Sequence, residues 1–286
     1  MTNTVTNAFV QQFDTTIRML AQQKESRFDG LVIDRGTIEG ESFTANHLAD
    51  IEDTPEKLVR HGDTVWSEAD HITRVALMKD FFQAVPVDRD DEPKVLANPS
   101  GIYADSLNSA WNRRKDAIIY AALRGNSQAK DGSSVVLPAS QKIAHGSAGF
   151  TLEKIIQAKK LFRANECDEH SGEELYMAYD PNAMEDILSD AYLTSIDRLA
   201  VKMLQDGEVG HKWMGFYWIP YNAIYSSGGV YYTVAWAKSA VHKGTGFVEG
   251  KADRRADKMD ALQVSLSASF GATRVHELGV VEIAYQ

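Results

Sequence analysis

Histidine and cysteine are the side chains of this sequence best suited to metal binding or nucleophilic catalysis. Eight histidines are spread along the chain, at positions 47, 61, 71, 145, 170, 211, 242 and 276. A single helix can bind zinc through two histidines four residues apart, as in the H-E-x-x-H motif. No two of these histidines have that spacing on a predicted helix, and the motif is absent. A zinc or iron site would therefore need histidines from distant segments. We predict no metal site and no cofactor.

The single cysteine, Cys167, lies in the acidic stretch ECDEH. Neighbouring carboxylates disfavour the thiolate that a nucleophile requires, and His170 is the only nearby residue that would favour it. We therefore predict an ordinary cysteine near a helix end. One cysteine cannot form an internal disulfide, which is typical of assembly in a reducing cytoplasm.

Three short motifs resemble ligand sites and are better explained otherwise. HKGTG (242–246) has a basic residue and two glycines but no following helix to bind a phosphate, and we interpret it as a loop. DRDDEP, from Asp88, lacks the glycine and the final glutamate of a calcium loop and predicts a solvated acidic turn, with a surface ion as the alternative. NRRK (112–115) lies on a predicted helix, where basic residues more often pair with carboxylates than bind nucleic acid.

No nucleotide-binding glycine loop and no G-x-S-x-G elbow occurs. We therefore predict that the protein is not an enzyme, with a soluble α/β enzyme whose site comes from distant residues as an alternative.

Composition narrows the class further. The 286 residues carry a net charge of −10 with a pI near 5.3, and the basic residues are scattered, which argues against a protein that grips nucleic acid. The sequence has no run of 18 apolar residues, which predicts no membrane span, and its first 20 residues lack the pattern of a secretory signal.

Two segments carry apolar residues without a core of their own. Residues 5–24 predict an amphipathic helix whose apolar stripe is Phe9, Phe13, Ile17 and Leu20. Residues 36–97 are polar and irregular but contain large apolar side chains, among them Trp66. Such a segment usually packs on something else, so we predict that both segments reach a neighbouring subunit. Our candidate subunit-interface residues are Phe9, Phe13, Ile17, Leu20 and Trp66.

The clearest predicted element is a helix over 99–124. Asn98 can cap it, Pro99 suits its first position and Gly125 ends it. A loop with a hairpin is predicted for 126–149, and Thr151 is predicted to cap the next helix. Further on we predict, in order, a strand at LYMAY, a helix capped by Asp180 and begun by Pro181, strands at GFYWIPYNAI and GVYYTVAWAKSAV, a strand from DKMDALQ to Val275, a turn at HELG and a last strand at GVVEIAY.

This order of elements resembles the major capsid proteins of tailed bacteriophages, which have the Hong Kong 97-type fold. LYMAYDPNAMEDILSD, the Gly215-Phe216 pair and the closing strands are similar to that family's packing patterns, and the resemblance covers nearly the whole chain. The fold class it implies is α+β. It implies an N-terminal arm (1–30), an extended loop (31–97), a peripheral domain with a long spine helix (98–149), an axial α/β domain (150–250) and returning strands of the peripheral domain (251–286). The last strand would then join the peripheral sheet.

The resemblance implies a shell protein that forms pentamers and hexamers and closes into an icosahedral head around double-stranded DNA, which is enclosed but not tightly bound. Its localisation would be the virion, after assembly in the host cytoplasm. The arm begins almost at Met1, so we expect a separate scaffolding protein, or a processed or scaffold-free form, and a portal as a further partner. An encapsulin-type bacterial compartment shell shares the fold and is the alternative.

Overall fold

The computed structural model describes residues 22–49, 69–87, 99–189 and 212–286, together with Glu56, Arg60 and Trp66. These residues form two compact units. Of the described residues, the first unit takes 22–25, 81–87, 99–113 and Val248–Ala268, and the second takes 26–49, 69–80, 114–189, 212–247 and Ser269–Gln286. Helix α1 (Pro99–Arg124) and strands β4 (Lys79–Val87), β13 (Val241–Arg255) and β14 (Ala261–Arg274) each continue from one unit into the other.

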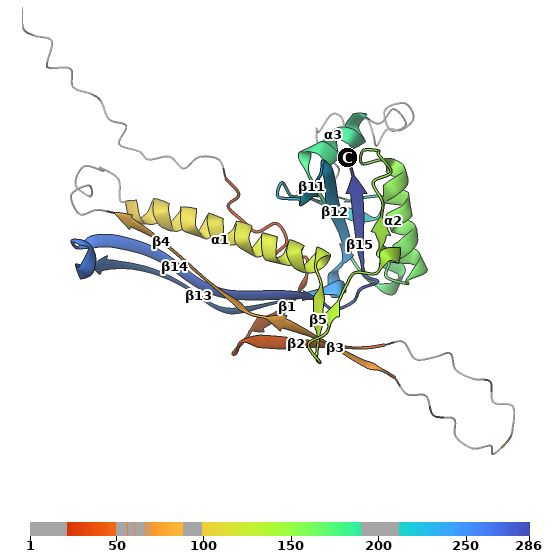
Figure 1. The fold of residues 1–286 in the computed structure, drawn as a ribbon, viewed down its shortest axis with the longest axis horizontal. Coiled ribbons are helices and arrows are strands. Elements are labelled where there is room, and N and C mark those ends of the chain that lie inside the picture. Colours follow the sequence, from red (N-terminus) through yellow and green to blue (C-terminus); the bar gives the residue numbers. More distant parts are fainter. Residues whose placement is uncertain are drawn as a thin grey trace, which may run out of the picture. The chain divides into compact units, whose positions relative to one another are not determined.

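Helix α1 has the bounds that the sequence predicts. It begins at Pro99, whose missing N–H costs nothing at the first helical position, and it ends at Arg124, one residue before Gly125. Its 26 residues correspond to a length of about 39 Å. It is the longest helix among the described residues and is the yellow helix of Figure 1.

One four-stranded sheet has the order β1-β13-β14-β4, in which β1 (Ile33–Thr37) pairs parallel to β13. The expected loop at HKGTG is wrong, because residues 242–246 lie inside β13. Glycine is needed there for close packing rather than for a turn. A Cβ on Gly244 would come within 2.6 Å of the Ile38 side chain, and one on Gly246 within 2.9 Å of Ser269.

A second four-stranded sheet is antiparallel and has the order β2-β3-β5-β6. It contains β2 (Ser42–Leu48), β3 (His71–Leu77), β5 (Ser127–Ala129) and β6 (Ser134–Val135), and the last two form the predicted hairpin after α1. The segment 31–97, predicted as the extended loop, contains four described strands. Strands β1 to β4 within it all pair with other strands (Figure 1).

The third sheet has seven strands in the order β7-β15-β12-β8-β10-β9, with β11 paired to β12. Its strands are β7 (Lys142–Ile143), β8 (Leu175–Tyr179), β9 (Lys212–Trp213), β10 (Phe216–Pro220), β11 (Ser226–Ser227), β12 (Val230–Ala237) and β15 (Val280–Tyr285). Helices α2 (Leu152–Ala164) and α3 (Pro181–Ser189) accompany it, with short 3-10 turns at Ala139–Gln141, Glu169–Ser171, Lys238–Ala240 and Ala256–Lys258.

The last strand departs from the expectation. Strand β15 pairs antiparallel with β12 and parallel with β7, so it completes the seven-stranded sheet instead of joining β13 and β14. All six of its residues are buried, which is why its sequence shows no alternation of apolar and polar residues. The chain end is thus structural, as expected, but in a different sheet.

The helix caps follow the sequence in one case and depart from it in another. Asp180 caps α3, because its Oδ1 accepts a hydrogen bond from the Ala183 N–H at 2.8 Å. Thr151 occupies the cap position of α2, but its side chain makes no capping hydrogen bond. No described helix is long and apolar enough to cross a membrane.

Candidate assembly surfaces

Trp66 lies in the stretch between β2 and β3, and 86% of its surface is exposed. An indole left in water by its own subunit is a typical anchor for a partner surface. Of the five predicted interface residues, Trp66 is the one that lies among the described residues. The other four, Phe9, Phe13, Ile17 and Leu20, lie outside the described residues.

The tip between β13 and β14 carries a second exposed apolar side chain. Met259 is 95% exposed, and both Met259 (φ 52°) and Asp260 (φ 61°) adopt the left-handed conformation that side chains disfavour. Beside the tip, Arg255 binds both Asp257 oxygens at 2.8 and 2.9 Å, and this hydrogen bonding holds the pKa of Asp257 at about 2. Sequence reasoning did not single out Met259, because a left-handed turn without glycine or asparagine leaves no signal.

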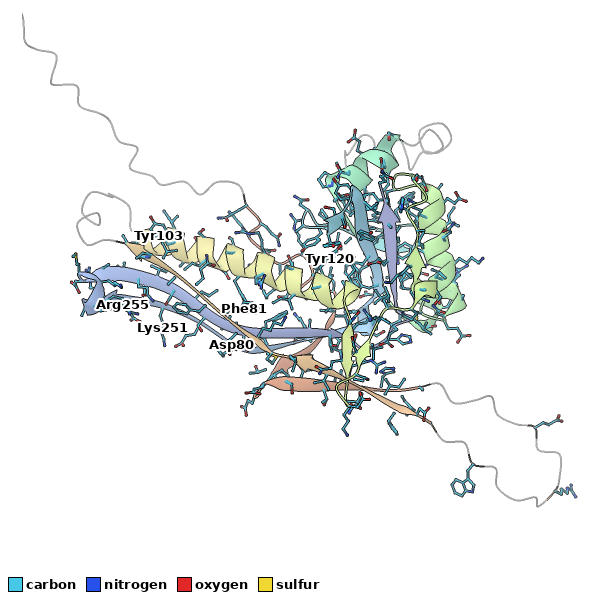
Figure 2. All side chains as sticks on the ribbon, in the orientation of Figure 1. Asp80, Phe81, Tyr103, Tyr120, Lys251 and Arg255 are labelled. Carbon is cyan, nitrogen blue, oxygen red and sulfur yellow. The ribbon has the colours of Figure 1, made fainter. Side chains whose placement is uncertain are left out.

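A groove of about 390 Å³ lies within the first unit, between α1 and the β13–β14 hairpin. The helix side is lined by small or apolar residues at every third position, namely Gly101, Ala104 and Leu107. Opposite lie Gly250 to Ala252 and Val264 to Leu266, and Figure 2 labels Lys251 and Arg255 on β13. The face is largely apolar, so it suits protein contact better than an ionic ligand.

A buried carboxylate fixes the segment after the arm. Asp116 on α1 is fully buried and accepts hydrogen bonds from the Ser26 hydroxyl at 2.5 Å and from the Arg27 and Phe28 N–H groups at 2.9 and 3.2 Å. In the first unit, the Asn112 amide donates to the Lys24 carbonyl at 2.7 Å. The chain is thus held where it leaves residues 1–21.

A second charge cluster lies where this segment enters β1. Lys243 on β13 is buried and pairs with Asp29 and with Asp34, the latter at 3.3 Å, while Lys115 reaches Asp29 at 3.2 Å. Burial lowers the pKa of Lys243. The two carboxylates offset that cost, since a buried cation without a partner is strongly unfavourable.

The C-terminal residues are held by a buried lysine. Lys154 on α2 donates from Nζ to the carbonyl oxygens of His145, Ala148, Gly149 and Ala284, at 2.8 to 3.0 Å. Burial lowers its pKa. The ammonium group thus joins the loop before α2 to the end of β15.

Two further bonds act on the same end of the chain. The Tyr285 hydroxyl donates to Asp180 Oδ1 at 2.5 Å, and the Gln286 N–H donates to the Ala148 carbonyl at 3.1 Å. Burial and the Asp180 carboxylate raise the pKa of Tyr285. The chain is therefore bonded to its own subunit out to its last residue.

The structure does not place Cys167 and His170 as a nucleophile and its base. His170 is placed by an N–H bond to Asp168, whereas Cys167 lies 3.7 Å from His276 Nδ1 and donates to the Asn165 carbonyl at 3.3 Å. Neither contact provides the base, orienting group and open cavity that a nucleophile needs. Across the described ranges, no three histidine, cysteine or acidic side chains are grouped so that they could hold a metal ion.

The architecture is the Hong Kong 97-type capsid fold. A subunit from the head of Helicobacter pylori bacteriophage KHP40 superposes with a TM-score of 0.73 over 99% of this chain and 97% of that chain, at 11% identity. A chain of Mycobacterium phage Che8 gives a TM-score of 0.70 over 97% of each chain, at 15% identity, and the capsid of Ralstonia phage GP4 gives 0.70 over 100% and 97%, at 9% identity.

The sequence itself matches the family model described as "Phage capsid protein" over residues 5–286, and the chain belongs to that family. It is a major capsid protein, a structural component of a phage particle, and the match favours a phage head over an encapsulin-type compartment. Among curated proteins, no sequence matches this chain.

Proposed function

We propose that this capsid protein assembles through pentamers and hexamers into an icosahedral head that encloses double-stranded DNA. The observation that carries the proposal is the nearly bare indole of Trp66, on a stretch that leaves the β2–β3 pair. A subunit that works alone gains nothing from holding a tryptophan in water, whereas a shell subunit can bury it on a neighbour.

The parts of the chain take the following roles in the proposal. Residues 1–30 are the arm, and Phe9, Phe13, Ile17 and Leu20 pack on a neighbouring subunit. Residues 31–97 are the extended loop that reaches across to a neighbour, with Trp66 as its anchor. Helix α1 is the spine, the long strands β4, β13 and β14 belong with it in the peripheral domain, and the seven-stranded sheet, now including β15, is the axial domain.

The partners follow from the class of protein and from its charge. A separate scaffolding protein guides assembly in the host cytoplasm, and a portal occupies one vertex. Each subunit has a net charge of −10, so the shell encloses DNA without gripping it. The chain has a structural role and is not an enzyme.

Assembly is tested by electron microscopy of the purified protein in negative stain, beside light scattering over a range of salt and protein concentrations. We expect capsomers or closed particles tens of nanometres across. A monodisperse monomer or dimer under every condition would refute the proposal, since a shell subunit must form large obligate interfaces.

A further inference from the structure

Two histidines from distant parts of the second unit meet at one point. His47 on β2 and His276 in the turn between β14 and β15 have ring centroids 5.9 Å apart, in an edge-to-face arrangement. His276 Nδ1 also lies 3.7 Å from the Cys167 sulfur, just after α2. The Nδ1 of His47 is buried and has no hydrogen-bond partner.

The same point holds an ion pair between β3, the other strand of the hairpin, and the same turn. Arg74 on β3, next to β2, binds Glu277 Oε1 at 3.0 Å through both Nε and Nη2. Glu277 follows His276 directly in the turn. One ring contact and one ion pair thus connect the β2–β3 hairpin to the β14–β15 turn.

We propose that the His47–His276 contact is an acid-sensitive latch, which holds the β2–β3 hairpin against the β14–β15 turn at neutral pH and releases it when the His47 imidazole is protonated.

The charges around the pair determine the direction of the effect. Arg74 and Glu277 face His47, and the buried Arg274 guanidinium interacts with both of those side chains. His242 on β13 also interacts with His47 and accepts a hydrogen bond from Arg35 Nε at 3.0 Å. Protonation of His47 would therefore place a positive charge beside Arg74, where Glu277 is already paired with that arginine.

Protonation equilibria agree with this geometry. Burial lowers the pKa of His47 below 6.5, and His276 and Arg74 lower it further, while Glu277 opposes them. A group whose pKa is lowered in the closed state binds fewer protons there than in the open state, so the closed state loses stability as the pH falls below about 6.5. Burial and Arg35 lower the pKa of His242 to about 4, so that residue contributes only in stronger acid.

The latch sits at the base of the stretch that carries Trp66, since β2 and β3 are the strands on either side of it. Release would free the base of that stretch without breaking the seven-stranded sheet. The inference concerns the single subunit and does not depend on shell formation.

Hydrogen exchange measured by mass spectrometry on the full chain tests the latch at pH 7.5, 6.5 and 5.5, with rates corrected for the intrinsic effect of pH. In the wild-type protein we expect peptides from Ser42–Leu48 and His71–Leu77 to exchange several-fold faster at pH 5.5 than at pH 7.5. Peptides from β12 and β15 should keep their protection.

Two variants and a matched control decide the cause. His47→Gln cannot be protonated at this position, so its hairpin exchange should not depend on pH. His276→Gln removes the ring contact, so its hairpin should exchange faster already at pH 7.5. His71→Gln removes an exposed histidine at the start of β3 and should behave as the wild type. The proposal is overturned if wild-type exchange does not change with pH, or if the response survives in His47→Gln. If His276→Gln also loosens β12 and β15, the pH response of the His47→Gln variant decides the proposal by itself.

Discussion

The substitution Lys154→Met tests how the C-terminal strand is held. Lys154 is only 6% exposed, and its ammonium group is bonded to four backbone carbonyl oxygens, one of which belongs to Ala284 in β15. Methionine fills a similar volume and keeps the packing of the stem, so the change isolates the ammonium group. We expect the variant to fold with a weakened attachment of α2 and β15.

The size of the loss follows from the groups left behind. A hydrogen bond to a charged donor contributes about 1.5–3 kcal/mol, and a buried carbonyl that loses its donor costs about 1–3 kcal/mol. These terms overlap, and some carbonyls will find water, so we expect a loss of about 3–5 kcal/mol in the free energy of unfolding. With a urea dependence of about 2–3 kcal/mol per molar, the unfolding midpoint should fall by about 1–2.5 M.

The assay is urea unfolding of unassembled protein, followed by circular dichroism, because assembly would add a concentration-dependent term. Lys160→Met is the matched control, since Lys160 is an exposed lysine on the same helix and its removal should change the free energy by less than about 0.5 kcal/mol. A loss for Lys154→Met no larger than that of the control would show that the four carbonyl bonds do not hold the strand, and the reasoning would be refuted.

Three other predictions concern the interfaces and the anchoring of the chain. Trp66→Ala should leave thermal unfolding of the subunit unchanged, because the indole is already in water, while capsomers or particles should dissociate at a lower denaturant concentration. Arg60→Ala in the same stretch is the control, and an equal loss of subunit stability in Trp66→Ala would show that Trp66 packs on its own subunit. Asp116→Ala should lower the free energy of unfolding by about 2–4 kcal/mol in urea titrations, since it removes the acceptor of three segment-anchoring donors, whereas exposed Asp105→Ala should have little effect; similar midpoints would contradict the anchor. Raising salt from low ionic strength to about 0.15 M should promote assembly measured by light scattering, because subunits of charge −10 repel and the screening length falls to about 8 Å; assembly that weakens with salt would argue for attractive charge pairs at the interface.

The elements that the sequence predicts well are those with local signals. The bounds of α1 follow from Pro99 and Gly125, and the start of α3 follows from Asp180 and Pro181, because caps and proline act within a few residues of themselves. The strand at LYMAY is likewise where the pattern places it. Here local preference and the final fold agree.

Strand pairing could not be predicted in the same way. The apolar run of β15 shows that both its faces are buried, but the partner strand depends on contacts more than 40 residues away in sequence, such as Ile283 opposite Thr233. The glycines of HKGTG misled for a related reason. A glycine needed because Ile38 crowds the backbone looks, in sequence, like a glycine needed for a turn.

The candidate surfaces also differ in whether the sequence could indicate them. Trp66 could be singled out because a large aromatic in a polar segment is conspicuous, and its exposure fits an interface role that remains a prediction. The His47–His276 contact joins residues 229 positions apart (276 minus 47), so no local pattern could indicate it. Residue type reveals single anchors, whereas clusters depend on topology.

Two buried cations attach the C-terminal strands to the rest of the subunit through hydrogen bonds, in addition to apolar packing. Lys154 binds the end of β15, and Arg274, at the end of β14, donates to the carbonyls of Leu123 and Gly125 at 3.1 and 2.6 Å. Those carbonyls lie at the C-terminal end of α1, where the helix dipole is negative and cations are stabilised. Arg274 also reaches the Val135 carbonyl at 3.1 Å, so one guanidinium joins α1, the hairpin after it and β14. Because backbone carbonyls accept these bonds, the attachment depends on the path of the chain rather than on a matching acidic residue, which is why no charge pattern in the sequence indicates it.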